Sequence, residues 1–209
     1  MDNKDNYFKS EEFKDILHRY EEAENSGRHE YLGSDELTDI AEYYYNLGRN
    51  KESRSTLDYA ISLHPGAAMP LVFRGRMALI DDHDVEKAKI YVNQITDQLN
   101  LDCLYLHAEI MIAENNSEGA DRFLHDVPDY ILDIAMMFMD YNLPDKAQEW
   151  LERSDETDLM DYRETKARIA FARGDYKQSE MIFEQLLDED PYSGRYWNSL
   201  ASTQFMSNR

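Results

Sequence analysis

A small residue recurs along this chain at nearly regular intervals, and all but the last instance are followed by a second small residue 12 or 13 positions later. The first members are Ala41, Gly75, Ala108, Ala135, Ala167 and Ala201, spaced by 34, 33, 27, 32 and 34 residues. The second members are Ser53, Ala88, Ala120, Ala147 and Ser179. A short polar break separates the two members of each pair. Because helices that cross closely need small side chains where their backbones meet, each pair predicts one helical hairpin.

Larger residues stand at fixed offsets from these small ones, where they would fill the space between helices. Four positions before the first members stand Leu37, Leu71, Leu104, Ile131, Arg163 and Trp197. Four positions after the second members stand Leu57, Val92, Leu124, Leu151 and Phe183. Pro65 and Pro191 follow two of the second helices, where proline ends one helix before the next begins. The pattern therefore favours an all-α chain of consecutive hairpins.

These offsets resemble the tetratricopeptide repeat (TPR), a helical hairpin of about 34 residues. Residues 34–67 match it at Leu37, Ile40, Ala41, Tyr44, Gly48, Leu57, Ala60 and Pro65. Residues 160–193 match it at Ala167, Gly174, Tyr176, Phe183 and Pro191, and residues 194–209 begin another unit with Trp197, Leu200 and Ala201. Arg74 and Lys166 depart from it at usually apolar positions, and residues 68–100 carry one extra residue in their turn. The resemblance covers residues 34–209 and implies a right-handed α-solenoid of about five TPR-like hairpins with a concave groove.

The repeat phase also gives a domain organisation. It divides residues 34–209 into units near 34–67, 68–100, 101–127, 128–159 and 160–193, with a partial unit at 194–209. Residues 1–33 are an N-terminal extension in which Ser10 can cap a helix whose Phe13, Ile16, Leu17 and Tyr20 share one face. Asn25–Gly27 would end that helix. We expect a capping helix, because an end repeat has no neighbour; the alternative is a segment that folds into the groove or swaps to a partner.

Charge and composition exclude several classes of function. The chain carries 43 Asp and Glu against 22 Lys and Arg, a net charge of −21, which argues against binding nucleic acids or anionic membranes. It has one cysteine, Cys103, and no run of apolar residues long enough to cross a membrane, so we expect a cytoplasmic protein.

Phosphate-loop, nucleophile-elbow and zinc-protease motifs are absent. The acidic stretch Asp81–Glu86 is expected to be a turn, and His107 to be packed in the core. We therefore predict no catalytic site, no metal site and no cofactor.

The groove implied by the TPR resemblance provides the candidate site. By phase with the small residues, its partner-binding positions are Tyr45, Val72, Arg76, Leu79, Tyr105, Glu109, Ile112, Leu132, Met136, Met139, Arg168 and Phe171. Exposed apolar patches usually mark interaction sites, and methionine suits an adaptable surface. The same residues would instead be core if adjacent first helices pack tightly, and the sequence leaves both interpretations open.

The sequence favours a non-catalytic scaffold or adaptor that binds a protein or peptide in this groove. Since the chain is acidic, the partner is expected to carry basic residues flanking apolar anchors. One alternative is a homo-oligomerisation module that self-associates through the C-terminal helix around Trp197. Another is a regulatory N-terminal part of a longer protein, because residues 194–209 supply a first helix without a second.

Overall fold

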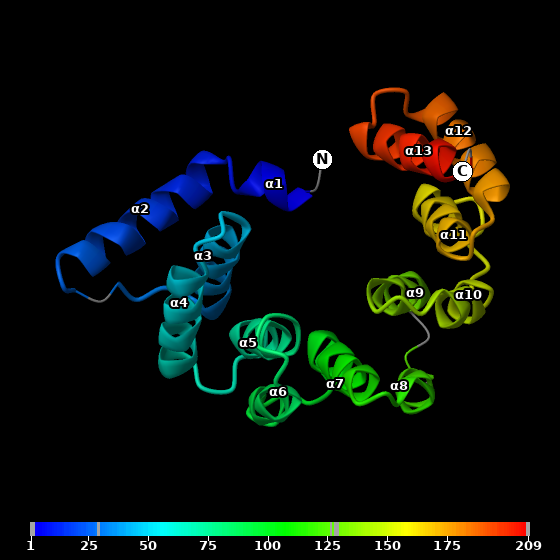
Figure 1. Ribbon diagram of the computed structural model, residues 1–209. Coiled ribbons are helices and arrows are strands. Elements are labelled where there is room, and N and C mark those ends of the chain that lie inside the picture. The colour runs from blue at the N-terminus through cyan, green and yellow to red at the C-terminus, as the bar shows by residue number, and fades with distance from the viewer. Residues whose placement is uncertain (1–2, 29, 126, 128–129, 208–209) are drawn as a thin grey trace. The chain divides into compact units, whose positions relative to one another are not determined.

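The computed structural model describes residues 3–28, 30–125, 127 and 130–207, and every regular element in those residues is an α-helix (Figure 1). The chain divides into two compact units, one up to Ala120 and one from Asp121 onward. No helix within the described ranges is both long and apolar enough to cross a membrane. The all-α class predicted from the sequence is therefore confirmed.

The N-terminal unit contains two leading helices and then paired ones. Its helices are α1 (Asn3–Tyr7), α2 (Glu11–Asn25), α3 (Ser34–Asn46), α4 (Asn50–Leu63), α5 (Ala68–Ile80), α6 (Val85–Val92) and α7 (Leu101–Ala113). Helix α8 (Ser117–Leu124) spans the boundary between the units. The C-terminal unit contains α9 (Ile131–Asp140), α10 (Pro144–Leu151), α11 (Met160–Ala172), α12 (Tyr176–Glu189) and α13 (Gly194–Ser207).

The predicted small-residue contacts are found inside the hairpins. No surface is exposed on the side chains of Ala41, Ser53, Ala88, Ala108, Ala120, Ala135, Ala147, Ala167 and Ser179. Gly75 is also buried, and its close neighbour belongs to the next hairpin: a Cβ atom added to it would lie 2.5 Å from Cδ2 of Leu106 on α7. The prediction that helices cross closely at these positions is therefore confirmed. Ala201 is exposed on α13, which packs on α12 and is the last helix of the described residues.

The turn between the two helices of each hairpin uses one residue with a left-handed backbone conformation. That residue is Gly48, His83, Asn115, Asn142 or Gly174, with φ between 52° and 82°. Glycine adopts this conformation without a steric penalty and asparagine tolerates it, whereas histidine is strained there. His83 stands eight residues after Gly75, while the other four stand seven after their small residue, which reflects the extra residue in the second hairpin.

His83→Gly is expected to raise the free energy of unfolding by about 0.5–1 kcal/mol, because relief of left-handed strain exceeds the entropic cost of glycine. Urea denaturation measures this. Gly48→Ala is the opposite control: no atom lies within 4 Å of its added Cβ, so a loss of about 1–2 kcal/mol would report the backbone conformation alone. A neutral or destabilising His83→Gly would mean that this turn is not strained.

Helix α2 covers the first hairpin, as expected of a capping helix. Its N-terminus is capped by Ser10, whose Oγ accepts a hydrogen bond from the backbone N–H of Phe13, and it ends at Asn25. Its buried face packs with α3 and α4 in one apolar cluster, which contains Phe13, Ile16, Tyr20, Leu32, Leu37, Ile40, Tyr44 and Ala60. The hydroxyls of Tyr20 and Thr56 are hydrogen-bonded at 3.1 Å, which ties α2 to α4.

One departure from the repeat pattern has a structural explanation, and one expectation based on the pattern fails. Arg74, at a usually apolar position, is buried; its Nε donates to Asp58 Oδ1 at 2.9 Å and its guanidinium lies over the ring of Tyr91. The expectation that Trp197 fills the space between helices is wrong. Its side chain is 54% exposed and its indole Nε1 donates to the carbonyl of Pro191 at 2.9 Å.

Candidate functional site

The first helices of the N-terminal unit form an open groove of about 470 Å³, which we name the N-terminal groove. Helices α3 and α5 supply most of its lining, and α1 and α7 supply one residue each. The lining residues are Lys4, Thr38, Glu42, Tyr45, Asn46, Met69, Val72, Phe73, Arg76, Met77, Ile80 and Asp102.

The apolar part of the N-terminal groove follows one stripe of α5. Val72, Phe73 and Ile80 stand three, four and eleven residues after Met69, so the four side chains project from the same side of the helix. The ring of Tyr45 meets that of Phe73 edge to face, with centroids 5.6 Å apart, and its hydroxyl donates to Asp81 Oδ1 at 2.9 Å. The groove therefore has an aromatic wall on α3 and an apolar wall on α5.

Exposure differs along this stripe. Val72 is buried, whereas 37% of Met69 and 59% of Ile80 are exposed. Large apolar side chains left open on both sides of an aromatic pair can contact an apolar side chain from another molecule. The groove therefore keeps apolar surface in contact with solvent outside the core.

The acidic end of the groove is on α3 and is neutralised by α1. The Lys4 ammonium donates to Glu42 and lies 3.4 Å from Asp39 Oδ1. Burial raises the pKa of the Asp39 carboxyl, and the attraction of Lys4 offsets part of that effect. Burial acts against the charged form of Lys4, but Glu42 and Asp39 outweigh it, and the pKa of Lys4 is raised. This end of the groove favours a cation.

Arg76 serves the fold as well as the groove. Its Nε lies 3.1 Å from both carboxylate oxygens of Glu109 on α7, and a second guanidinium nitrogen lies 3.0 Å from Glu109 Oε1. Glu109 is buried, so the ion pair compensates a carboxylate that water scarcely reaches. Arg76 therefore links α5 to α7 and neutralises Glu109, which leaves Glu42, with Asp39 beside it, and Asp102 as the acidic side chains at the groove.

The predicted positions of the N-terminal unit separate into two groups. Tyr45, Val72 and Arg76 line the N-terminal groove. Leu79, Tyr105 and Glu109 are buried, and Ile112 is half-buried; none of these four lines the groove. Leu79 belongs to the apolar cluster shared by α5, α6 and α7. Adjacent first helices pack closely enough at these positions to give them a structural role.

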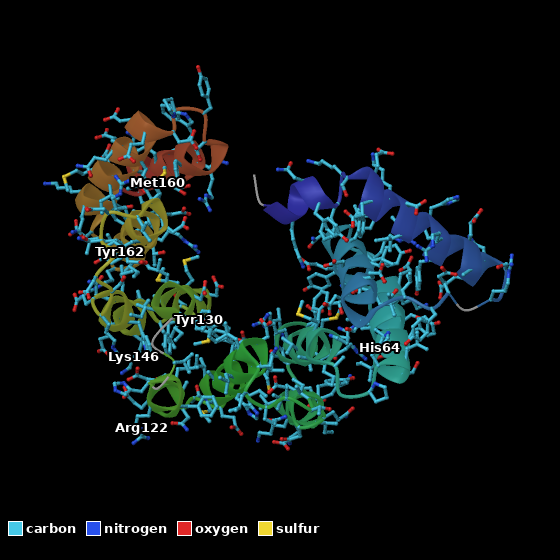
Figure 2. The ribbon with its side chains drawn as sticks, turned by 180° about the vertical axis from the view of Figure 1, so that it is seen from behind. His64, Arg122, Tyr130, Lys146, Met160 and Tyr162 are labelled. Atoms are coloured by element: carbon cyan, nitrogen blue, oxygen red, sulfur yellow. The ribbon has the colours of Figure 1, made fainter. Side chains whose placement is uncertain are left out.

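In the C-terminal unit, Leu132 and Met136 line a pocket of about 680 Å³, which we name the Arg195 pocket. Its lining residues are Tyr130, Ile131, Leu132, Asp133, Met136, Arg153, Ser154, Asp155, Glu156, Asp161, Glu164, Thr165 and Arg195. Figure 2 labels Tyr130, which directly precedes α9. Arg195 lies 2.6 Å from the largely buried Glu164. Burial raises the pKa of Glu164, and the attraction of Arg195 and Arg168 offsets only part of that effect.

The remaining three predicted residues lie elsewhere in the same unit. Met139, Arg168 and Phe171 line a smaller pocket of about 370 Å³ with residues of α12 and α13. Arg168 also reaches Met136, with a guanidinium nitrogen 3.2 Å from Sδ, and Thr165 Oγ1 lies 3.4 Å from the same sulfur. The predicted residues of this unit are therefore divided between two pockets.

Sequence reasoning missed several residues of the N-terminal groove, among them Lys4, Phe73, Met77 and Ile80. Lys4 was assigned to an extension outside the repeats, and its helix is too short to give a periodic signal. Phe73, Met77 and Ile80 flank the predicted α5 positions and line the groove as well. The sequence does show that Phe73, Met77 and Ile80 are apolar. Because α5 is apolar around most of its circumference, the pattern could not tell which of its side chains face the groove and which face the core.

The residues considered for other chemistry have structural partners. Arg54 pairs with Asp81 and Asp82, and the side chain of Asp84 caps α6 by accepting from the N–H of Lys87. Cys103 is buried, and burial raises the pKa of its thiol. Within the described part of the chain, no three or more His, Cys, Asp or Glu side chains are grouped so that they could hold a metal ion.

Comparisons with known proteins add one structural likeness. No family model matches the chain, and no curated protein matches it. Among solved structures, the chain is similar to the crystal structure of a tetratricopeptide repeat protein from Parabacteroides merdae. The two are 18% identical with a TM-score of 0.42, and the match covers 95% of this chain and 75% of that one.

Proposed function

We propose that this chain is a non-catalytic protein-interaction module, a scaffold or adaptor that binds a peptide segment of its partner in the N-terminal groove. The observation that carries the proposal is the apolar stripe of α5, which is exposed at Met69 and Ile80 and packs against Tyr45 through Phe73. Met69 and Ile80 stay open to solvent there, next to Tyr45 and Phe73. Of the three pockets that contain predicted residues, this groove combines an open apolar stripe with a distinct acidic end.

The charge of the groove indicates the partner's chemistry. Glu42 and Asp102 border the apolar stripe, and the whole chain has a net charge of −21. A partner segment with an apolar anchor and an adjacent lysine or arginine complements this surface, and complementary charge accelerates encounter. Binding of such a segment should weaken as salt rises, because exposed charges are screened over about 8–10 Å at ordinary ionic strength.

A matched pair of isoleucines tests the proposal. Ile80 lines the groove and is 59% exposed, whereas Ile90 on α6 is 58% exposed and does not line it. Peptides are selected from a random display library on the full chain, and the dissociation constant of a selected peptide is measured by titration calorimetry. Ile80→Asp is expected to weaken binding by at least about tenfold, because it places a charge at an apolar contact. Ile90→Asp is expected to leave it nearly unchanged.

Equal effects of the two substitutions would remove the N-terminal groove as the binding site. Since both introduce the same charge at the same exposure in the same unit, a difference between them cannot come from net charge or general surface polarity. Circular dichroism of both variants confirms that they are folded before binding is compared.

A second candidate function is self-association through α13. Trp197, Ala201 and Phe205 succeed one another at four-residue intervals, and all three are exposed, with Trp197 at 54% and Phe205 at 60%. An exposed apolar face of this kind can pack against the same face of a second copy of the chain. Self-association through α13 and peptide binding in the N-terminal groove are independent of each other. Light scattering over a concentration series distinguishes a dimer from a monomer.

A further inference from the structure

Helix α1 already places a cation at the acidic end of the N-terminal groove. Lys4 is a lining residue of the groove, and its ammonium contacts the side chains of Glu42 and Asp39 on α3. The two carboxylates are one helical turn apart and half-buried, with 28% and 21% of their side chains exposed. Two partly desolvated carboxylates side by side repel each other, so a cation between them stabilises both. Any partner that displaces Lys4 must therefore bring a cation of its own.

Besides Lys4, the side chain of Tyr7 also interacts with Asp39, and the remaining contacts of this segment are aromatic and lie outside the open groove. Tyr7 and Phe8 pack against Phe13 with ring centroids 5.4 and 4.9 Å apart, and Phe8 also meets Tyr43 at 5.7 Å. These rings anchor the junction between α1 and α2. The apolar stripe at Met69 and Ile80 is left open by them, so α1 occupies the charged end of the groove only.

The short length of α1 and the exposure of the Lys4 ion pairs make its binding to the groove weak. The helix has five residues, too few for a helix to be stable in isolation. The side chain of Lys4 is 44% exposed, and an ion pair in contact with water contributes little to stability. The segment can therefore leave the groove while Phe8 and Phe13 keep its far end attached.

We propose that the partner segment displaces α1 from the N-terminal groove. The segment replaces Lys4 with a lysine or arginine of its own and adds an apolar side chain at Met69 and Ile80. The proposal rests on the function proposed above and specifies its partner: a basic residue beside an apolar anchor. It also assigns a regulatory role to α1, which lowers the apparent affinity for every partner in proportion to the time that Lys4 occupies the site.

The chain's own N-terminal sequence serves as the probe. A fluorescent peptide with the sequence of residues 3–10, blocked at both ends, is titrated into the full chain and into its Lys4→Glu and Lys9→Glu variants. Lys9 is exposed and does not line the groove, so its substitution matches the change in net charge without touching the site. Lys4→Glu is expected to bind the probe at least about fivefold more tightly than the wild-type chain, since the tethered competitor is removed.

Three further results complete the test. Lys9→Glu should bind the probe like the wild-type chain, and a probe that carries the Lys4→Glu change should lose the gain. Hydrogen exchange of the amides of Phe8, Lys9 and Ser10, which are bonded to carbonyls within residues 4–7, should accelerate in Lys4→Glu alone. Equal probe affinity in all three chains would overturn the proposal. Weaker binding of the probe to Lys4→Glu would also overturn it, because Lys4 would then contribute to the binding site instead of competing for it.

Failure of this inference is distinguishable from failure of the proposed function. Suppose that Ile80→Asp weakens binding of the selected peptides, that Ile90→Asp does not, and that Lys4→Glu leaves the affinity for the probe unchanged. The groove then binds peptides, and α1 does not compete with them. If selected peptides bind the two isoleucine variants equally, the groove itself is not the site. Lys4→Met provides a second variant that removes the cation without adding repulsion, and it should show a smaller gain in the same direction.

Discussion

Trp150→Ala is expected to lower the free energy of unfolding by about 3–5 kcal/mol, the range for removing a large aromatic side chain from a core. Trp150 is only 1% exposed. Its indole Nε1 donates to Asp121 Oδ1 at 2.8 Å, and the Arg153 guanidinium lies over its ring at 4.0 Å. The substitution leaves a cavity at α10 and removes one hydrogen-bond donor of Asp121, which Lys146 and Arg153 also contact. Urea denaturation followed by far-ultraviolet circular dichroism measures the loss.

The second tryptophan of the chain supplies the control. Trp197 is 54% exposed on α13, so Trp197→Ala should change the free energy of unfolding by no more than about 0.5 kcal/mol. Because each hairpin contacts only its neighbours, hydrogen exchange in Trp150→Ala should accelerate most in α9 to α11. Equal losses from the two substitutions would contradict the burial of Trp150 and the hairpin formed by α9 and α10.

Tyr105→Ala is expected to lower the free energy of unfolding by roughly 2–5 kcal/mol. Tyr105 occupies a first-helix position that the repeat phase assigns to the concave face, yet it is only 8% exposed. Truncating a buried side chain of this size removes apolar burial and leaves a cavity between neighbouring helices. Tyr31→Ala, at a tyrosine of the same unit that is 75% exposed, should stay within about 0.5 kcal/mol.

The stability of these two tyrosine variants separates the two interpretations that the sequence left open. A large loss for Tyr105→Ala means that first helices pack against each other at this point of the array. An unchanged denaturation midpoint would instead mean that Tyr105 faces solvent and is available to a partner. Measurement of both variants under identical urea conditions decides the matter without any knowledge of the partner.

The hairpin pattern was predictable from the sequence because backbone proximity restricts side-chain size at specific positions. Ala41 and Ser53 had to be small where α3 crosses α4, and the same pairing recurs through Ala167 and Ser179. The Ser10 cap was predictable too, since its hydrogen bond to the N–H of Phe13 is local. Features that depend on contacts within one hairpin or at one helix end can therefore be predicted from a short segment of the sequence.

The groove was only partly predictable, because it depends on the distance between neighbouring hairpins. Helical phase places Tyr105 and Val72 on the same side as Tyr45, but it does not say how closely the next first helix approaches. Tyr105 is consequently buried while Tyr45 lines the groove. Lys4 was not predictable at all, since its position is fixed by carboxylates on α3 more than 30 residues away.

Mapping a selected peptide onto the full chain by nuclear magnetic resonance tests the central claim most directly. The chain is labelled with ¹⁵N, and amide shifts are followed as the peptide is added. We expect the largest changes along α3 and α5, around Tyr45, Phe73 and Ile80, with release of α1 from the groove. Changes concentrated in the Arg195 pocket or on α13 around Trp197, with α3 and α5 undisturbed, would contradict the assignment of the binding site.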